Sequence, residues 1–88
     1  MKFTEFCEQN GIKLLRDDFR YIVSMIGHLQ SEARKACLKA YADEWLAELE
    51  FNQHSSQAMN MARRRANLAL PEIVESVLGK IRGLAHHD

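Results

Sequence analysis

Three consecutive arginines, Arg63, Arg64 and Arg65, are the most conspicuous candidates for chemistry in this 88-residue sequence. A guanidinium group binds carboxylates and phosphates through paired hydrogen bonds, so this arginine run can contact an acidic protein or a nucleic acid. Neighbouring side chains on a helix point about 100° apart, and the three therefore cannot all face one ligand. At most one or two of them can make such a contact.

A second basic cluster, consisting of Arg34, Lys35 and Lys39, lies near the start of a long predicted helix whose end is acidic. The acidic residues are Asp43, Glu44, Glu48 and Glu50. This order opposes the helix macrodipole, which favours anions at the N-terminus and cations at the C-terminus. Either another part of the chain offsets this cost, or the pattern serves a partner.

A hairpin that folds back near residue 53 or 54 offers an internal explanation. It sets the arginine run beside Asp43 and Glu44, although exposed ion pairs contribute only about 0–1 kcal/mol each. Internal pairing, a protein partner and a nucleic acid all stay open for the arginine run. The second basic cluster meets little negative charge in this hairpin except Glu72. It is therefore a better candidate for an external contact than the arginine run, although the account that we favour for it is a solvated face.

Cysteines and histidines are the remaining candidates for catalysis or metal binding. Cys7 and Cys37 are far apart and form no Cys-x-x-Cys motif, which favours two buried free thiols over a disulfide framework or a zinc site. The histidines are His28, His54, His86 and His87. The last two fall in a predicted solvated tail, where adjacent residues seldom form a defined metal site. A nucleophilic pair of a cysteine with His28 or His54 has no further support. We expect no catalytic residue, no metal and no cofactor, and hence no enzyme.

Apolar residues recur at helical spacing, and short polar breaks divide the chain. We expect helices at 2–9, 17–29, 31–51, 57–70 and 71–81. Asn10 and Gly11 end the first of these, and Pro71 either begins the last helix or kinks a continuing one. The sequence thus predicts an all-α fold. It is a small bundle of four to five helices organised around a long antiparallel helical hairpin at 31–70.

Three apolar stripes form the predicted core, with Trp45 at its centre because it carries the largest side chain. The second helix contributes Phe19, Ile22, Val23, Met25, Ile26 and Leu29. The long helix contributes Leu38, Tyr41, Ala42, Trp45, Leu46 and Leu49. The returning helix contributes Ala58, Met61, Ala62, Ala66 and Ala69, with Leu68 and Leu70 alongside. Asp17 or Asp18 and then Ser31 are the expected N-caps, and Gly83 is the expected helix end.

Length and composition indicate one helical domain, 1–88, with a short flexible tail at 84–88. The formal net charge is zero, whereas a protein that coats nucleic acid non-specifically is usually strongly basic. The N-terminus lacks the apolar run of a signal peptide, and no run approaches the ~20 apolar residues of a membrane span. We therefore expect a cytoplasmic protein without membrane contact.

Some of the apolar and aromatic residues can serve an interface as well as a core. Tyr21, Phe51, Met59 and Met61 can mark an interface, although methionines at helical spacing usually fill a core. Five apolar helix faces can also exceed what one short chain covers. A homodimer through the 71–81 helix or the N-terminal helix is therefore one of the expected partner states.

Several segments carry a resemblance to a known group. They are Ile26-Gly27-His28-Leu29, Ser31-Glu32-Ala33-Arg34, Tyr41-x-x-x-Trp45 and the eight residues from Arg63 to Leu70. Together they resemble short helical proteins encoded by bacteriophages, prophages and mobile elements. That resemblance implies a small accessory protein that acts by binding, for example to a host nucleic-acid or defence complex, and it carries over no catalytic residue. We expect a helix-mediated protein–protein interaction; the alternative is a DNA- or RNA-binding accessory protein.

Overall fold

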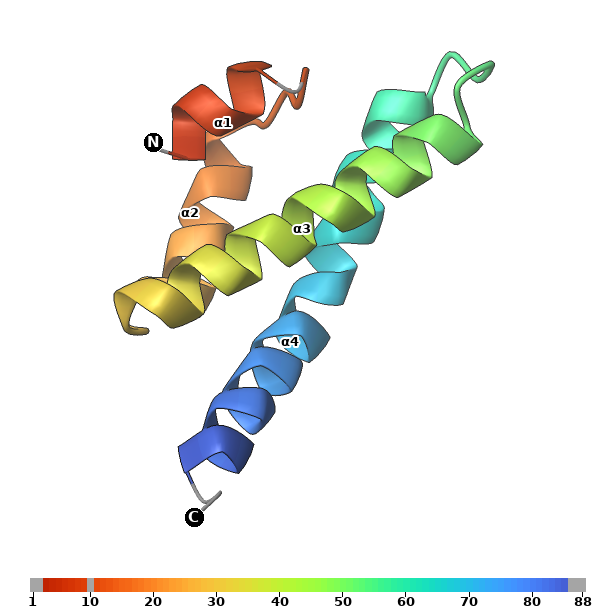
Figure 1. Cartoon of the computed structure of the whole chain (residues 1–88). Helices are drawn as coiled ribbons and strands as arrows, with labels where there is room; N and C mark the ends of the chain where they lie inside the picture. Colours follow the sequence, from red (N-terminus) through yellow and green to blue (C-terminus); the bar gives the residue numbers. More distant parts are fainter. Residues whose placement is uncertain (1–2, 10, 86–88) are drawn as a thin grey trace.

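The chain is all-α. The computed structural model describes residues 3–9 and 11–85, and side chains within 5–81 apart from those of residues 6 and 10. Over these residues it has four helices and no strand (Figure 1). They are α1 (Phe3–Gln9), α2 (Arg16–Ile26), α3 (Ser31–Phe51) and α4 (Ala58–Ala85). The predicted helical hairpin is present. Its arms, α3 and α4, are the two longest of these helices, and they pack antiparallel against each other.

The turn after α1 follows from a glycine. Gly11 has a φ of +69°, the left-handed conformation that ends helices. Its N–H donates to the carbonyl of Glu8, and the N–H of Ile12 donates to the carbonyl of Cys7. This pair of bonds is the Schellman motif, and the buried side chains of Cys7 and Ile12 supply its usual apolar contact. The prediction that the first helix ends at this glycine is therefore confirmed.

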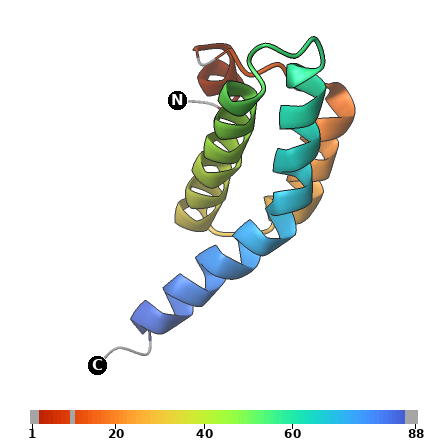
Figure 2. The same ribbon diagram turned by 90° about the vertical axis from the view of Figure 1, so that its right-hand side faces the viewer.

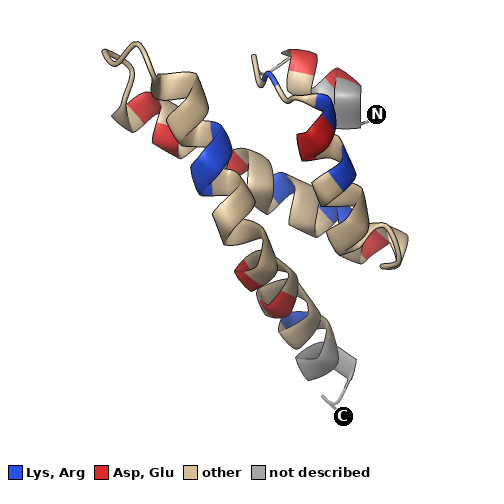
Figure 3. Ribbon diagram, turned by 180° about the vertical axis from the view of Figure 1, so that it is seen from behind, with Lys and Arg blue, Asp and Glu red and all other residues tan. Residues whose placement is uncertain are grey.

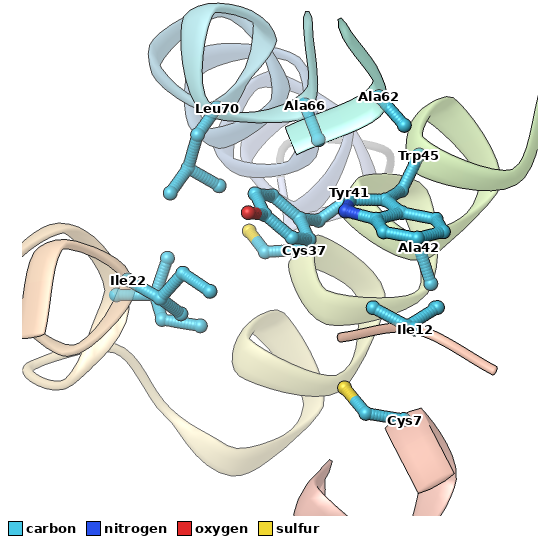
Figure 4. Close-up of a cluster of buried hydrophobic side chains, with 11 residues drawn as sticks. Cys7, Ile12, Ile22, Cys37, Tyr41, Ala42, Trp45, Ala62, Ala66 and Leu70 are labelled. Atoms are coloured by element: carbon cyan, nitrogen blue, oxygen red, sulfur yellow. The ribbon is translucent and has the colours of Figure 1, made fainter. Parts of the chain in front are cut away.

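Small residues on α4 determine how closely the hairpin packs. Ala58, Ala62, Ala66 and Leu70 recur every four residues on the face of α4 that is buried. In Figure 4 the methyl groups of Ala62 and Ala66 lie over the rings of Tyr41 and Trp45. Tyr41 and Trp45 are fully buried, which confirms the predicted core centre. Because alanine adds little bulk to a helix face, the two large aromatic rings fit between α3 and α4.

Several predicted core positions and helix ends are wrong. Val23, Met61 and Leu68 are exposed, since the buried stripes of α2 and α4 are narrower than the sequence pattern suggests. Ser31 is the first residue of α3 rather than its cap, and no side chain caps that helix. Gly83 does not end α4, which continues to Ala85. The predicted tail beyond Ala85 lies outside the described residues.

The last two predicted helices are one continuous helix. Pro71 lies inside α4, which runs through it for 28 residues. The helix therefore extends well past the body of the bundle, as Figures 1 and 2 show, and the molecule measures 50 × 22 × 20 Å. No helix in the described part of the chain combines the length and apolar character needed to cross a membrane.

Candidate functional site

A buried carboxylate organises the contact between α2 and α4. Asp18 is only 4% exposed. It occupies the third position of α2, and its Oδ2 accepts a hydrogen bond of 2.8 Å from the backbone N–H of Leu15. A carboxylate at this position satisfies an unpaired amide and lies at the favourable end of the helix dipole. The prediction that Asp17 or Asp18 is the N-cap is wrong, because Leu15 is the N-cap residue and both aspartates lie inside the first turn of α2.

Two side chains of α4 complete the surroundings of Asp18. The Nε–H of Arg63 donates to Asp18 Oδ2 at 3.1 Å, and the Nδ2–H of Asn67 donates to Asp18 Oδ1 at 2.9 Å. Asn67 in turn accepts a hydrogen bond of 2.6 Å at its Oδ1 from the hydroxyl of Tyr41 on α3. This polar cluster therefore connects α2, α3 and α4.

The same cluster explains how α4 continues through a proline. Pro71 has no N–H, so the carbonyl of Asn67 loses its intrahelical donor. The hydroxyl of Tyr21 on α2 donates to that carbonyl at 3.2 Å. A residue that the sequence marks only as a candidate for an interface is thus the substitute donor at the break in the helix.

Buried groups near the cluster are held in their neutral forms. Burial, and then the charge of Asp18, raise the pKa of Tyr41 well above its usual range, so its hydroxyl remains a donor. Burial raises the pKa of the Cys7 thiol to about 11 and also raises the pKa of Cys37. Both cysteines are free and buried, as expected, and a protonated thiol is a poor nucleophile.

The arginine run splits into three directions. Arg63 points inward to Asp18, and the Nε of Arg65 lies 3.6 Å from Glu44 Oε2. Figure 3 shows the basic band on the first half of α4 close to acidic segments of α3. The predicted pairing with α3 is therefore correct for Glu44. It is wrong for Asp43, which instead accepts from Lys39 on its own helix at 3.3 Å. The fold leaves Arg64 exposed, and among the described residues it has no hydrogen bond or ion pair.

Arg64 lies among both polar and apolar side chains, and Glu48 lines one of the hollows beside it. Two open hollows, of about 540 and 380 Å³, lie on either side, and Arg64 and Leu68 line both. Leu68 is 69% exposed, and Met61 at the first hollow is 40% exposed. Tyr21 lines the second hollow. We call the surface formed by Tyr21, Met61, Arg64 and Leu68 the Arg64 surface.

The second basic cluster is dispersed along the exposed side of α3. Lys35 lies 4.0 Å from Glu32, and Lys39 lies 3.3 Å from Asp43, both on the same helix and both largely exposed. Arg34 has no ion pair within the described part of the chain. Such exposed pairs contribute little free energy, so these residues stay available to a partner.

Sequence reasoning missed Asn67 and gave Asp18 too small a role. A usable signal existed, because Asp18 lies four residues before Ile22 and eight before Ile26, on the stripe that is buried. A carboxylate on a buried stripe requires donors from another element. Within the described residues, no three His, Cys, Asp or Glu side chains gather closely enough to hold a metal ion.

Comparisons with known proteins give no relative: no family model, curated protein or solved structure matches the chain.

Proposed function

We propose that this protein is a non-enzymatic accessory protein that binds an acidic, partly apolar segment of another protein through the Arg64 surface. The observation that supports this most directly is the isolation of Arg64. Its two neighbours are already paired with Asp18 and Glu44, whereas Arg64 has no carboxylate partner among the described residues. An exposed cation flanked by apolar groups fits a partner that offers a carboxylate between apolar side chains.

The composition of the Arg64 surface supports a protein partner. Arginine, tyrosine and methionine are enriched in protein interfaces, and arginine and tyrosine are frequent among the residues that contribute most binding energy. The aliphatic stem of Arg64 can pack on apolar groups while its guanidinium binds a carboxylate. Leu68 and Met61 supply exposed apolar area beside it. This kind of binding agrees with the accessory role that the resemblance to small phage and mobile-element proteins implies.

The polar cluster around Asp18 serves this surface by fixing α4. Because Asp18 holds Arg63 and Asn67, the face of α4 that carries Arg64 and Leu68 has one rotational setting against α2. A surface that is fixed before binding loses less conformational entropy when the partner docks. The cluster is thus a support for binding, with its hydrogen-bonding groups used within the fold.

Affinity capture tests the proposal. The full chain is immobilised and exposed to nuclease-treated lysate of the source cells, beside the variants Arg64→Ala and Arg34→Ala. We expect a protein that wild type and Arg34→Ala retain and that Arg64→Ala loses. Equal retention by all three chains would contradict the role of Arg64.

A salt titration distinguishes the nucleic-acid alternative, which would use the second basic cluster together with the arginine run. Binding to a short DNA or RNA duplex is measured between about 50 and 200 mM salt. A loss of about 10³-fold or more over this range is typical of proteins that make many phosphate contacts. We expect no measurable duplex binding at low salt, and steep salt-dependent binding would instead favour the alternative.

A further inference from the structure

The turn of α4 that precedes Pro71 is fixed to both neighbouring helices. At Asn67, the backbone carbonyl accepts the 3.2 Å hydrogen bond from the Tyr21 hydroxyl of α2. The side chain of Asn67 accepts a hydrogen bond from Tyr41 of α3 at 2.6 Å and donates one to Asp18 of α2 at 2.9 Å. Three hydrogen bonds therefore hold α4 to the bundle at the last turn before the proline.

Beyond this turn α4 changes direction. Figure 2 shows the first half of the helix, residues 58–70, running beside α3, and the second half leaving it at an angle. Pro71 lies between the two halves, and sharp bends in helices usually occur at a proline. The proline ring clashes with the carbonyl four residues earlier, here that of Asn67, and this clash opens the helix on that side. Pro71 is therefore the pivot of the bend.

We propose that residues 72–81 form a helical arm that turns about Pro71 as a unit, and that the Tyr21 hydroxyl is the latch that keeps this arm in its bent position. The bond from Tyr21 to the Asn67 carbonyl is the closed state of the latch. The proposal concerns the mechanics of the fold. It goes beyond the binding role of the Arg64 surface and does not depend on it.

The contacts of the arm with the other helices do not by themselves select one angle. Ile73, Val74 and Val77 pack partly against the core, and no side chain from 72 to 81 is fully buried. No charged side chain of the arm has an ion pair among the described residues. Apolar contacts have no preferred direction, whereas a hydrogen bond does. A directional contact near the pivot is therefore needed to fix the arm.

The Tyr21 hydroxyl lies where the angle of the arm is decided. In an α-helix each residue faces the carbonyl four residues earlier, so the ring of Pro71 faces the carbonyl of Asn67. A hydroxyl bonded to this carbonyl occupies the space that the ring would enter if the helix straightened. Tyr21 and Asn67 both line the open hollow of about 380 Å³, so water can reach the carbonyl once the hydroxyl is removed. Water imposes no single direction, and the arm then samples other angles.

Residual dipolar couplings of the full chain, measured by NMR, test the latch because they report how rigidly the arm is oriented relative to residues 58–70. In wild type both segments should show an order parameter S² of about 0.85, as rigid backbone does. In Tyr21→Phe the value for the arm should fall to about 0.6 or lower, while that of residues 58–70 is unchanged.

Ser24→Ala is the matched control for the latch. It removes another hydroxyl of α2, which donates to the carbonyl of Tyr21 at 2.7 Å within the same helix. We expect the arm of this variant to be as ordered as that of wild type. A rigid arm in Tyr21→Phe would overturn the proposal, as would an equal loss of order in Ser24→Ala.

A second variant separates turning about the proline from local unfolding of the arm. Pro71→Ala restores an N–H that can donate to the Asn67 carbonyl, so adding Tyr21→Phe to it should leave the order of the arm unchanged. The Cα chemical shifts of residues 72–81 should remain helical in every variant, because the arm turns as a unit. Loss of helical shifts in Tyr21→Phe, or loss of order in the double variant, would overturn the proposal.

Discussion

The two halves of α4 differ in how they use their side chains. In the first half, residues 58–70, four side chains are buried against α3, and Arg63 and Asn67 bind Asp18. In the second half, residues 71–81 include no fully buried side chain, and Ile73, Val74 and Val77 cover the core only partly. Pro71 lies at the boundary between them.

This difference indicates that the two halves of α4 contribute unequally to the stability of the fold. The first half contributes most of the folding free energy that α4 provides, because burial and satisfied polar groups are concentrated there. The exposed side of this first half carries Arg64 and Leu68, which belong to the surface that we propose for a partner. The second half packs Ile73, Val74 and Val77 against the core only as partly buried side chains, and Ile81 is 41% exposed.

The largest expected effect on the free energy of unfolding is at the core centre, which packs against the first half of α4. Trp45→Ala should lower the free energy of unfolding by about 3–5 kcal/mol, because it removes a fully buried aromatic side chain. Trp45→Phe should cost much less, since the indole Nε1–H has no acceptor in the described structure. Urea denaturation followed by circular dichroism measures both. Similar losses for the two variants would contradict the central role of aromatic packing.

The next effect concerns the polar cluster. Asp18→Asn should lower the free energy of unfolding by about 2–3 kcal/mol, because Arg63 loses a charged acceptor that is largely buried. Asp17→Asn is the matched control. Asp17 is the exposed neighbour that pairs with Arg20 at 3.9 Å, and its loss should change stability by about 0.5 kcal/mol or less. Equal effects in urea denaturation would show that the cluster does not fix α2 to α4.

A smaller effect tests the boundary at Pro71. Tyr21→Phe should cost about 1 kcal/mol, because the carbonyl of Asn67 loses its substitute donor. In a Pro71→Ala background the new N–H can donate to that carbonyl, so Tyr21→Phe should then cost clearly less. A double-mutant cycle measures the difference as a coupling energy. Full additivity would mean that the Tyr21 hydroxyl does not compensate for the proline.

The smallest expected effect on stability comes from the exposed ion pair that joins α3 to α4. Glu44 and Arg65 should couple by about 0.5 kcal/mol or less, since both side chains remain partly exposed at 3.6 Å. Asp43 and Arg64 should show no coupling, because Asp43 pairs with Lys39. Two double-mutant cycles in urea provide the comparison. A stronger coupling of Asp43 with Arg64 would place α4 in a different register against α3.

Periodicity was sufficient for the fold class, the hairpin and the core stripe through Tyr41 and Trp45. It could not place the polar cluster, because a buried Asp18 looks like any residue of a first helical turn until Arg63 and Asn67 approach from another helix. It also could not decide whether Pro71 starts or continues a helix, since the answer depends on the distant hydroxyl of Tyr21. Whether the predicted contact residues bind a partner stays a prediction.

Amide hydrogen exchange of the full chain tests the division of α4 most directly. Amides at 62–70 should exchange only through global unfolding, whereas amides at 76–81 should open locally at a free energy at least about 2 kcal/mol lower. Exchange of both halves with one common free energy would contradict the division.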